Sequence, residues 1–343
     1  MEPNAYRERL WHPRTDCPMV KQASYSYGNA GEVTAVTRMK IFVAGATGVI
    51  GRRAVPLLLE AGHQVTAAGR DPAKLRQLER LGARTQAVDL FDLVAVRRAV
   101  EEAEVVCNLA TAVPAAGARM FLPGAWRAMD RVRREVSRNL VEAALAGGAV
   151  QRLIQESFAP IYAAAGDAWV TESFAVRPAR YNRSAVDAEA QAERFTRAGR
   201  TGVVLRFGLF YGPDDPSTTM LIDAVRRGWF PLFGRPEAYS SWVAHDDAAG
   251  AVAAALGVAA GIYNVVEGEP MRRRDLADGL ARRLGVRPPR FFPGWVAKLG
   301  GSVAGAMERS LRISNRKLRG ASEWTLRYPS TLDGLEAVMV GNA

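Results

Sequence analysis

From residue 39 onward, short apolar runs alternate with segments in which apolar positions recur every three or four residues. The first run, residues 40–44, is β-branched and aromatic and ends at a glycine, which predicts a buried strand of a parallel sheet. Strands are expected at 64–68, 85–88, 105–109, 152–155 and 202–207, and helices at 54–61, 72–81, 93–103, 137–146 and 181–198. This order predicts βαβ units with right-handed crossovers, and hence an α/β fold with a Rossmann-type, doubly wound parallel sheet.

The alternation loosens after Tyr211, where prolines separate short helices. We therefore expect a dinucleotide-binding Rossmann domain at 39–212. Residues 213–343 are expected to form mainly a smaller C-terminal substrate-binding domain, with some segments returning to the first domain. The uncharged run 248–266 predicts a buried helix followed by a strand. Residues 1–38 lack any periodicity and are expected to be a disordered extension.

The composition is that of a globular protein, with 48% hydrophobic and 24% charged residues among 343. Its two cysteines, Cys17 and Cys107, lie far apart, which excludes a disulfide framework, a zinc knuckle and a CxxC redox pair. They favour a reducing, cytoplasmic compartment. No secretory segment is evident, and contact of residues 291–307 with a membrane surface is not expected.

The formal net charge of +11 raises the question of a nucleic-acid partner. The arginines are spread over many segments, and the densest runs lack the interleaved aromatic residues of a base-stacking platform. We therefore expect no nucleic-acid partner. A basic surface of this kind still attracts small anionic substrates.

A phosphate-binding turn is the strongest chemical signal in the sequence. The glycines of Gly45-x-x-Gly48-x-x-Gly51 stand between an expected strand and an expected helix. The first allows a tight turn, the second lets main-chain N–H groups approach a pyrophosphate, and the third lets helix and strand pack closely. The helix N-terminus then faces the phosphates. The residues expected to bind the cofactor here are Gly45, Thr47, Gly48, Val49, Ile50 and Gly51.

The end of the second strand indicates which dinucleotide binds. An NAD site places a carboxylate there for the ribose 2′-hydroxyl, whereas this chain has Gly69-Arg70. We therefore expect NADP, with Arg70 on the 2′-phosphate and Arg52 as a second cation, and NAD as the less favoured cofactor. The alternative is that Arg70 is a surface residue before a helix.

The ends of the third and fourth strands are expected to complete the cofactor site. Asp89 is a candidate for the adenine amino group, although a helix N-cap is an equally reasonable role. The other residues expected to contact the cofactor are Leu90, Leu109, Ala110 and Thr111.

Together these motifs resemble the extended short-chain dehydrogenase/reductases, the group of UDP-sugar epimerases, dehydratases and 3β-hydroxysteroid dehydrogenases. Three later segments agree with the glycine spacing: LRFGLFYGP at 205–213, WVAHDDAA at 242–249 and GIYNV at 261–265. The resemblance covers residues 39–335. It implies a Ser or Thr that holds the reacting oxygen, a Tyr that transfers a proton, and a Lys that lowers the pKa of the Tyr.

Ser157 and Tyr181, which are 24 residues apart, match the serine and tyrosine of that pattern. The lysine is absent, because Ala185 stands one helical turn after the tyrosine. Arg183 is about 200° round the helix from Tyr181 and cannot replace it. Without the ammonium group, the pKa of Tyr181 is expected to stay near about 10.

Three further residues are candidates for the substrate site. Tyr162 resembles the tyrosine of the family's VYG segment and is expected either to contact the substrate or to pack in the core. Glu156 precedes Ser157 and is a candidate acid or base. His245 lies beside two aspartates, but the family's histidine aligns with Ala244, so neither a catalytic nor a metal-binding role is expected, and no metal site is predicted.

The sequence therefore predicts an NAD(P)-dependent oxidoreductase of the extended or atypical short-chain type, which exchanges hydride with a carbonyl, alcohol or sugar-nucleotide substrate. An epimerase or dehydratase would use the same site. The alternative is a non-catalytic NADP-binding sensor or assembly protein that has lost the lysine. A small-molecule substrate is expected. The sequence does not decide whether the protein forms a homodimer.

Overall fold

The computed structural model describes residues 38–122, 124–295 and 300–341. The predicted extension at 1–38 lies outside these residues except for Arg38. Among the described helices, none is long and apolar enough to cross a membrane.

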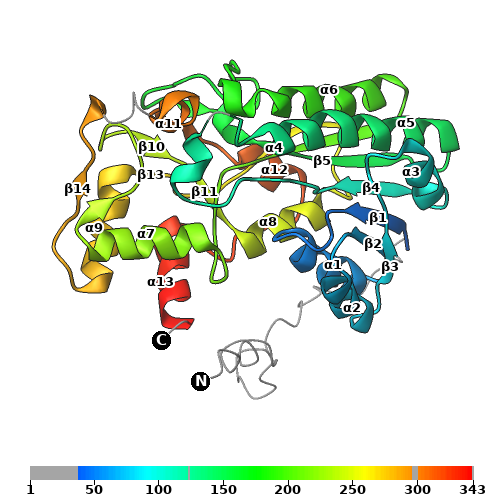
Figure 1. Cartoon of the computed structure of the whole chain (residues 1–343), viewed down its shortest axis with the longest axis horizontal. Coiled ribbons are helices and arrows are strands. Elements are labelled where there is room, and N and C mark those ends of the chain that lie inside the picture. Colours follow the sequence, from blue (N-terminus) through cyan, green and yellow to red (C-terminus); the bar gives the residue numbers. More distant parts are fainter. Residues whose placement is uncertain (1–37, 123, 296–299, 342–343) are drawn as a thin grey trace. The chain divides into compact units, whose positions relative to one another are not determined.

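A seven-stranded parallel sheet forms the centre of the described chain, as predicted (Figure 1). Its strand order is β12-β7-β5-β4-β1-β2-β3, and the order reverses between β1 and β4. In open α/β sheets, ligands bind outside the carboxyl ends of the strands at such a reversal. The strands are β1 (Lys40–Ala44), β2 (Gln64–Gly69), β3 (Arg84–Ala87), β4 (Val105–Asn108), β5 (Arg152–Phe158), β7 (Thr201–Phe207) and β12 (Gly261–Val265).

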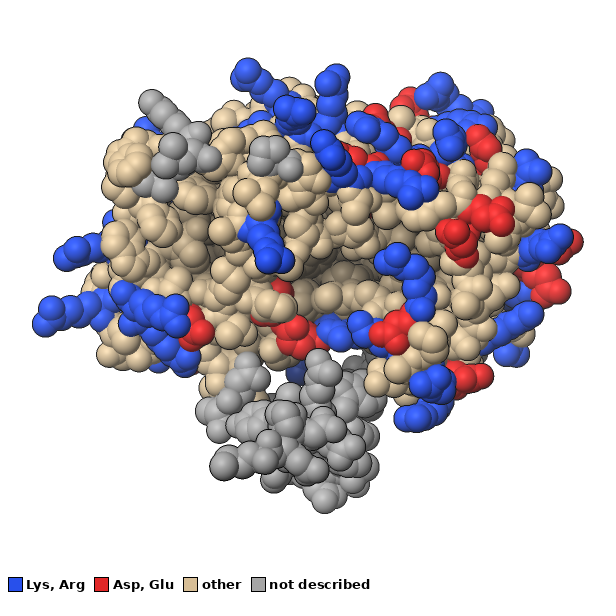
Figure 2. All heavy atoms as spheres, viewed as in Figure 1, with Lys and Arg blue, Asp and Glu red and all other residues tan. Residues whose placement is uncertain are grey.

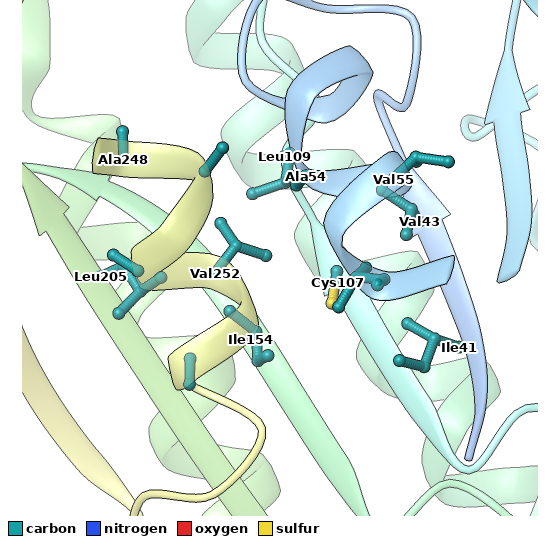
Figure 3. Packing of buried hydrophobic residues seen from close by; sticks show 14 of the residues in the cluster. Ile41, Val43, Ala54, Val55, Cys107, Leu109, Ile154, Leu205, Ala248 and Val252 are labelled. Carbon is teal, nitrogen blue, oxygen red and sulfur yellow. The ribbon is translucent and has the colours of Figure 1, made fainter. Parts of the chain in front are cut away.

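Helices cover both faces of the sheet. On one face α1 (Gly51–Glu60) packs against α8 (His245–Ala254) and against α2 (Pro72–Arg80). On the other face α5 (Ser137–Gly147) lies between α3 (Leu93–Val100) and α6 (Ser184–Arg197). Figure 3 shows the core between α1, α8 and the sheet, where Cys107 is fully buried and burial raises the pKa of its thiol to about 12. We therefore expect the Cys107 thiol to be unreactive and to have a structural role.

The segment after β7 builds a second, smaller group of elements, seen at the left of Figure 1. Its core joins α7 (Pro216–Arg226), α9 (Arg273–Leu284) and α13 (Thr331–Gly341). Short strand pairs complete it: β8 (Leu209–Tyr211) with β11 (Trp242–Ala244), β9 (Trp229–Phe230) with β14 (Arg290–Phe291), and β10 (Tyr239–Ser240) with β13 (Met271–Arg272). A further pair joins β6 (Trp169–Val170), which precedes β7, to β15 (Arg312–Ile313). The run 248–266 contains all of α8 except its first three residues, followed by β12, so the chain returns to the large sheet after residue 213. The division at residue 212 remains a prediction.

Several short elements lie around the carboxyl ends of β4 and β5. The helix α4 (Arg127–Arg131) continues through a π-helical turn (Val132–Val136) into α5. The sequence did not reveal this extension, because four arginines between residues 127 and 134 obscure any apolar period. The 3₁₀ turns η2 (Ala118–Phe121), η4 (Ala159–Ile161) and η5 (Arg180–Asn182), and the helix α11 (Gly301–Met307), complete the region. The helix α12 (Arg316–Ala321) instead packs against β12.

Charged side chains are distributed rather than concentrated on the face shown in Figure 2. Lys and Arg side chains occur over most of it with Asp and Glu among them, and the face is hollowed near its middle. The expected absence of a nucleic-acid partner remains a prediction.

Candidate cofactor and active site

The turn between β1 and α1 has the close main-chain packing that a phosphate-binding turn requires. Gly45 has a φ of 75°, and a Cβ there would lie 2.6 Å from the carbonyl oxygen of Leu109 and 2.7 Å from the Cα of Ala110. A Cβ at Gly51 would collide with the carbonyl oxygen of Gly45. A larger residue at either position would collide with main-chain atoms, which cannot move aside as a flexible side chain can. Both positions therefore require glycine.

The N-terminus of α1 is electrostatically suited to a pyrophosphate. No side chain caps it, and its first turn contains no acidic residue. Gly48 and Val49 are exposed in front of it. Uncapped N–H groups at a helix N-terminus attract phosphate. The residues of this turn thus fit the diphosphate of a dinucleotide.

The end of β2 lies directly beside this turn. A Cβ on Gly69 would lie 2.6 Å from the side chain of Thr47. The next carboxylate, Asp71, is engaged as the N-cap of α2, where it accepts hydrogen bonds from Ala73 N at 2.9 Å and Lys74 N at 3.3 Å. Arg70 is exposed, and within the described chain it forms no ion pair. A guanidinium rather than a carboxylate is therefore exposed at the end of β2.

Asp89 lies at the carboxyl edge after β3 and is not a helix cap. One of its oxygens accepts a hydrogen bond from Phe91 N at 2.9 Å, whereas the N-cap of α3 is Asp92. Leu90 follows it and accepts a hydrogen bond at its carbonyl from Asn139 Nδ2 at 3.1 Å. The adenine role of Asp89 remains a prediction.

The segment after β4 borders the phosphate-binding turn. Leu109 is buried, and its N–H donates to the carbonyl of Ala44 at 3.0 Å. Ala110 comes next, and its main chain lies so close to Gly45 that a Cβ on Gly45 would collide with it. Thr111 is exposed. The structure thus gathers the residues predicted to bind the cofactor at the carboxyl ends of β1 to β4.

Arg52, the expected second cation for the 2′-phosphate, contacts a different group. It pairs with Asp214, which follows β8, and Arg53 donates to Asp214 at 2.6 Å and to Asp246 at 3.0 Å. These ion pairs join the first turn of α1 to the loop after β8 and to the start of α8. The role of Arg52 at the 2′-phosphate remains a prediction, and a phosphate there would have to compete with Asp214.

His245 is buried at the start of α8, with Nδ1 3.6 Å from Asp214 and Nε2 3.7 Å from Asp215. Burial, and next the charge of Arg53, lower its pKa to about 4 against the opposing effect of Asp215. The imidazole is therefore neutral at pH 7. In the described residues, no group of three or more His, Cys, Asp or Glu side chains is arranged to hold a metal ion.

Ser157 lies near the end of β5 and is 1% exposed. Its hydroxyl donates to Glu189 Oε1 at 2.6 Å, and Glu189 receives two further hydrogen bonds from Arg206, each at 2.7 Å. A substrate oxygen would have to compete with Glu189 for the Ser157 proton. The role of Ser157 in holding the reacting oxygen of the substrate remains a prediction.

Tyr181 lies in η5 and is 6% exposed. The ring of Trp126 packs edge-on against it, with centroids 4.8 Å apart. Burial raises the pKa of Tyr181 to about 12, although the charges of Arg309 and Arg133 oppose the shift. This differs from the expected value near 10, because the phenol is removed from water by a ring from a segment 55 residues earlier.

The position one helical turn after Tyr181 is fully buried and holds Ala185. Glu189 lies one helical turn after Ala185 on the same side of α6, and its carboxylate is neutralised by Arg206. No cation from α6 therefore reaches the phenol from the position that a lysine would occupy.

Glu156 and Tyr162 are both buried and both engaged by other protein groups. Glu156 receives two hydrogen bonds from Arg133, at 3.0 and 3.2 Å. The hydroxyl of Tyr162 donates to Asn264 Oδ1 at 2.8 Å. Each side chain would have to break these hydrogen bonds in order to bind a substrate. Their contacts with a substrate remain predictions.

Comparison with known proteins identifies the family. Residues 45–222 match a family model described as NAD(P)H-binding. The chain belongs to this NAD(P)H-binding family. It is 34% identical over 311 residues to the 3-diazoavenalumate denitrifying reductase of a Streptomyces species, a match that covers 87% of this chain and 99% of that protein. A shorter match, 45% identical over 56 residues, is to the uncharacterized protein YbjS of Escherichia coli.

Solved structures show the same fold as this NAD(P)H-binding chain. The UDP-glucose 4-epimerase of Thermus thermophilus, in complex with NAD, has a TM-score of 0.70 at 24% identity and covers 88% of this chain and 98% of its own. The dTDP-glucose 4,6-dehydratase DesIV of Streptomyces venezuelae, with NAD and TYD bound, has a TM-score of 0.71 at 21% identity and covers 88% and 96%. The predicted extended short-chain fold and the predicted class of NAD(P)-dependent enzyme are confirmed.

Four residues of this site were not found by sequence reasoning: Arg133, Glu189, Arg206 and Arg309. Glu189 had one available signal, because it repeats the helical spacing of Tyr181 and Ala185. No sequence signal identified the three arginines, because the sequence does not show whether an arginine is buried or exposed.

Proposed function

We propose that this protein is an NADPH-dependent reductase that delivers hydride to an electron-poor acceptor and depends little on acid catalysis by the protein. The observation that carries this proposal is the state of Tyr181: its phenol is buried, Ala185 rather than a lysine stands one helical turn after it, and its pKa is raised to about 12. A protonated phenol cannot accept a proton at neutral pH. The site therefore favours reduction over the oxidation of an alcohol, which needs a base.

When bound, the nicotinamide would supply a hydride, which is one proton together with two electrons, to the substrate. Gly45, Gly48 and Gly51 would hold the diphosphate, because they let main-chain N–H groups approach it closely. We propose that Tyr181 supplies a proton only where the product needs one, and that Ser157, paired with Glu189, positions the end of β5. An acceptor that loses a leaving group on reduction needs no proton from the protein.

The relative that is 34% identical is named a denitrifying reductase of a diazo compound, which supports both the reductive direction and an electron-poor acceptor. The solved relatives that share the fold are named epimerases or dehydratases of sugar nucleotides. The absence of a lysine at Ala185 by itself also suits a cofactor-binding sensor. Similarity to a named reductase over 87% of the chain favours the enzyme.

The Tyr181→Phe variant tests this function. With an activated acceptor such as an aryl diazonium salt, NADPH oxidation is expected to fall less than about threefold, because the transition state needs no proton from the phenol. With a simple ketone, loss of a positioned acid would cost about 10²-fold or more. Stopped-flow loss of NADPH absorbance measures both.

The pH profile of the wild-type protein gives a second readout. Because the pKa of Tyr181 is about 12, the phenol stays protonated from pH 6 to 10, and single-turnover hydride transfer should show no ionisation in that range. An ionisation between pH 6 and 9 that Tyr181→Phe removes would show instead an activated tyrosine. Binding of NADPH without turnover of any acceptor would support the sensor.

NADPH is proposed as the cofactor in preference to NADH, and Arg70→Ala tests this preference. The variant is expected to weaken NADPH binding about tenfold, or about 1.4 kcal/mol, because it removes the exposed guanidinium at the end of β2. NADH binding should change less than twofold. Cofactor fluorescence titration measures both, with the exposed Arg76→Gln in α2 as a matched control. Equal losses for the two cofactors would contradict the 2′-phosphate role of Arg70.

A further inference from the structure

The surroundings of Tyr181 are apolar and aromatic on several sides. Phe158 from the end of β5, Met307 from α11, and Met120, Phe121 and Trp126 from the segment around η2 all belong to one cluster with Tyr181. We call these six residues the tyrosine cluster. They come from four separate parts of the chain, so the tertiary structure and no single motif creates this environment.

The tyrosine cluster offers few polar groups to a ligand. The indole N–H of Trp126 donates to the main-chain carbonyl of Met120 at 2.8 Å and is thereby engaged. The remaining members, except for the Tyr181 hydroxyl, have no hydrogen-bonding side chain. A sugar ring placed here would bury hydroxyl groups against carbon and sulfur, which is unfavourable because those groups would lose their hydrogen bonds to water.

Aromatic rings continue from the tyrosine cluster toward the surface. Phe121 packs edge-on against Phe233 at 5.5 Å between centroids, Phe233 lies 5.8 Å from Phe292, and Phe292 stacks on Trp229 at 5.3 Å. Trp229 is 41% exposed. Planar rings pack well on such a strip, since offset and edge-on ring pairs add to the area buried.

The cation Arg309 lies near Tyr181 and has no carboxylate partner among the described residues. Arg309 donates from Nη1 to the main-chain carbonyls of Tyr162 at 2.9 Å and Pro160 at 3.4 Å, and the latter oxygen also accepts from Asn182, the neighbour of Tyr181. Among the residues that the structure describes, neither Arg309 nor the exposed Arg177 has an acidic partner.

The electrostatic state of Arg309 favours an anion. Burial and then the charge of Arg177 lower its pKa, against the effect of Tyr181. Arg133, the other cation acting on Tyr181, is already neutralised by Glu156. A half-buried guanidinium held only by carbonyls and repelled by a second guanidinium is stabilised by a carboxylate, which it binds in a planar, bidentate manner.

We propose that the substrate is a planar aromatic carboxylic acid, with its ring against the tyrosine cluster and its carboxylate on Arg309. This inference rests on the proposed reductase function and names the substrate class of the same site. It separates this chain from the solved relatives of the same fold that are named for sugar nucleotides.

Calorimetric titration of the full-length protein, saturated with NADP⁺, tests the proposal with three probes. These are trans-cinnamate, its neutral isostere cinnamamide, and UDP-glucose. We expect cinnamate to bind at least tenfold more tightly than cinnamamide, and UDP-glucose to bind more weakly than cinnamate. Arg309→Gln should remove the preference for the acid and leave cinnamamide binding within about twofold.

Two further variants separate charge from structure. Arg309→Lys keeps the positive charge and should retain part of the acid preference, even if Arg309→Gln is poorly folded. Arg76→Gln removes an exposed arginine on α2 and should change nothing.

Equal binding of acid and amide, or tight binding of UDP-glucose alone, would overturn the aromatic-acid proposal. The reductase proposal would then still stand if NADPH binds and transfers hydride to another acceptor. Failure of NADPH itself to bind would instead overturn the proposed function.

Discussion

The Gly45→Ala variant is expected to lose at least about a hundredfold in affinity for NADPH, or about 2.8 kcal/mol. The added methyl group would lie 2.6 Å from Leu109 O and 2.7 Å from the main chain of Ala110, so the turn must open. The residue also has a φ of 75°, which an L side chain adopts reluctantly. The main-chain N–H groups would no longer converge on the diphosphate. Fluorescence titration with NADPH measures the effect.

Gly62→Ala is the matched control for this variant. Gly62 follows α1 with a φ of 85°, but a Cβ there would have no atom within 4 Å. It therefore carries the same backbone strain without the steric conflict, and NADPH affinity should stay within about twofold. If the two variants bind NADPH equally well, the close packing of Gly45 against the end of β4 is not what shapes the cofactor site.

The Glu189→Ala variant is expected to lose about 3–5 kcal/mol of unfolding free energy. Glu189 and Arg206 have side chains that are 10% and 4% exposed, and the substitution leaves the Arg206 guanidinium buried without its carboxylate. Ser157 loses its hydrogen-bond acceptor at the same time. Urea denaturation followed by circular dichroism measures this loss.

Glu193→Ala provides the comparison on the same helix. Glu193 lies one turn further along α6, is 68% exposed and pairs with Arg197 at 3.5 Å. Exposed pairs of this kind contribute roughly 0–1 kcal/mol, so little change is expected. If Glu189→Ala and Glu193→Ala destabilise equally, the Glu189–Arg206 pair is not the element that secures α6 to the sheet.

The main features of the sheet and the cofactor turn were predictable from the sequence, since both depend on local pattern. Strand β1 was predicted with both of its ends, because an apolar run stops at Gly45. Element ends were less predictable. Strand β5 continues to Phe158 rather than ending at Gln155, because its last residues pair with Leu205 to Phe207 of a strand that follows much later in the chain. Helix α6 begins at Ser184, since Tyr181 belongs to a 3₁₀ turn.

The chemistry around Tyr181 was predictable only in part. The absence of a lysine at Ala185 is visible in the sequence. The raised pKa of Tyr181 is not, because it results from burial under Trp126, which outweighs the opposing charges of Arg309 and Arg133. These residues lie far from the tyrosine in the chain, and no spacing relates them to it.

By itself, the sequence determined the Rossmann-type order of strands and helices, the glycine turn, the arginine at the end of β2 and the missing lysine. Each of these depends on neighbours within a few residues, such as φ at Gly45 or helical spacing from Tyr181. Only the tertiary structure decided which charges are neutralised. Glu189 meets Arg206, Glu156 meets Arg133, and Arg309 meets only carbonyls in the described chain. The free energy of a buried charge depends on partners that only the folded chain brings within a few ångströms.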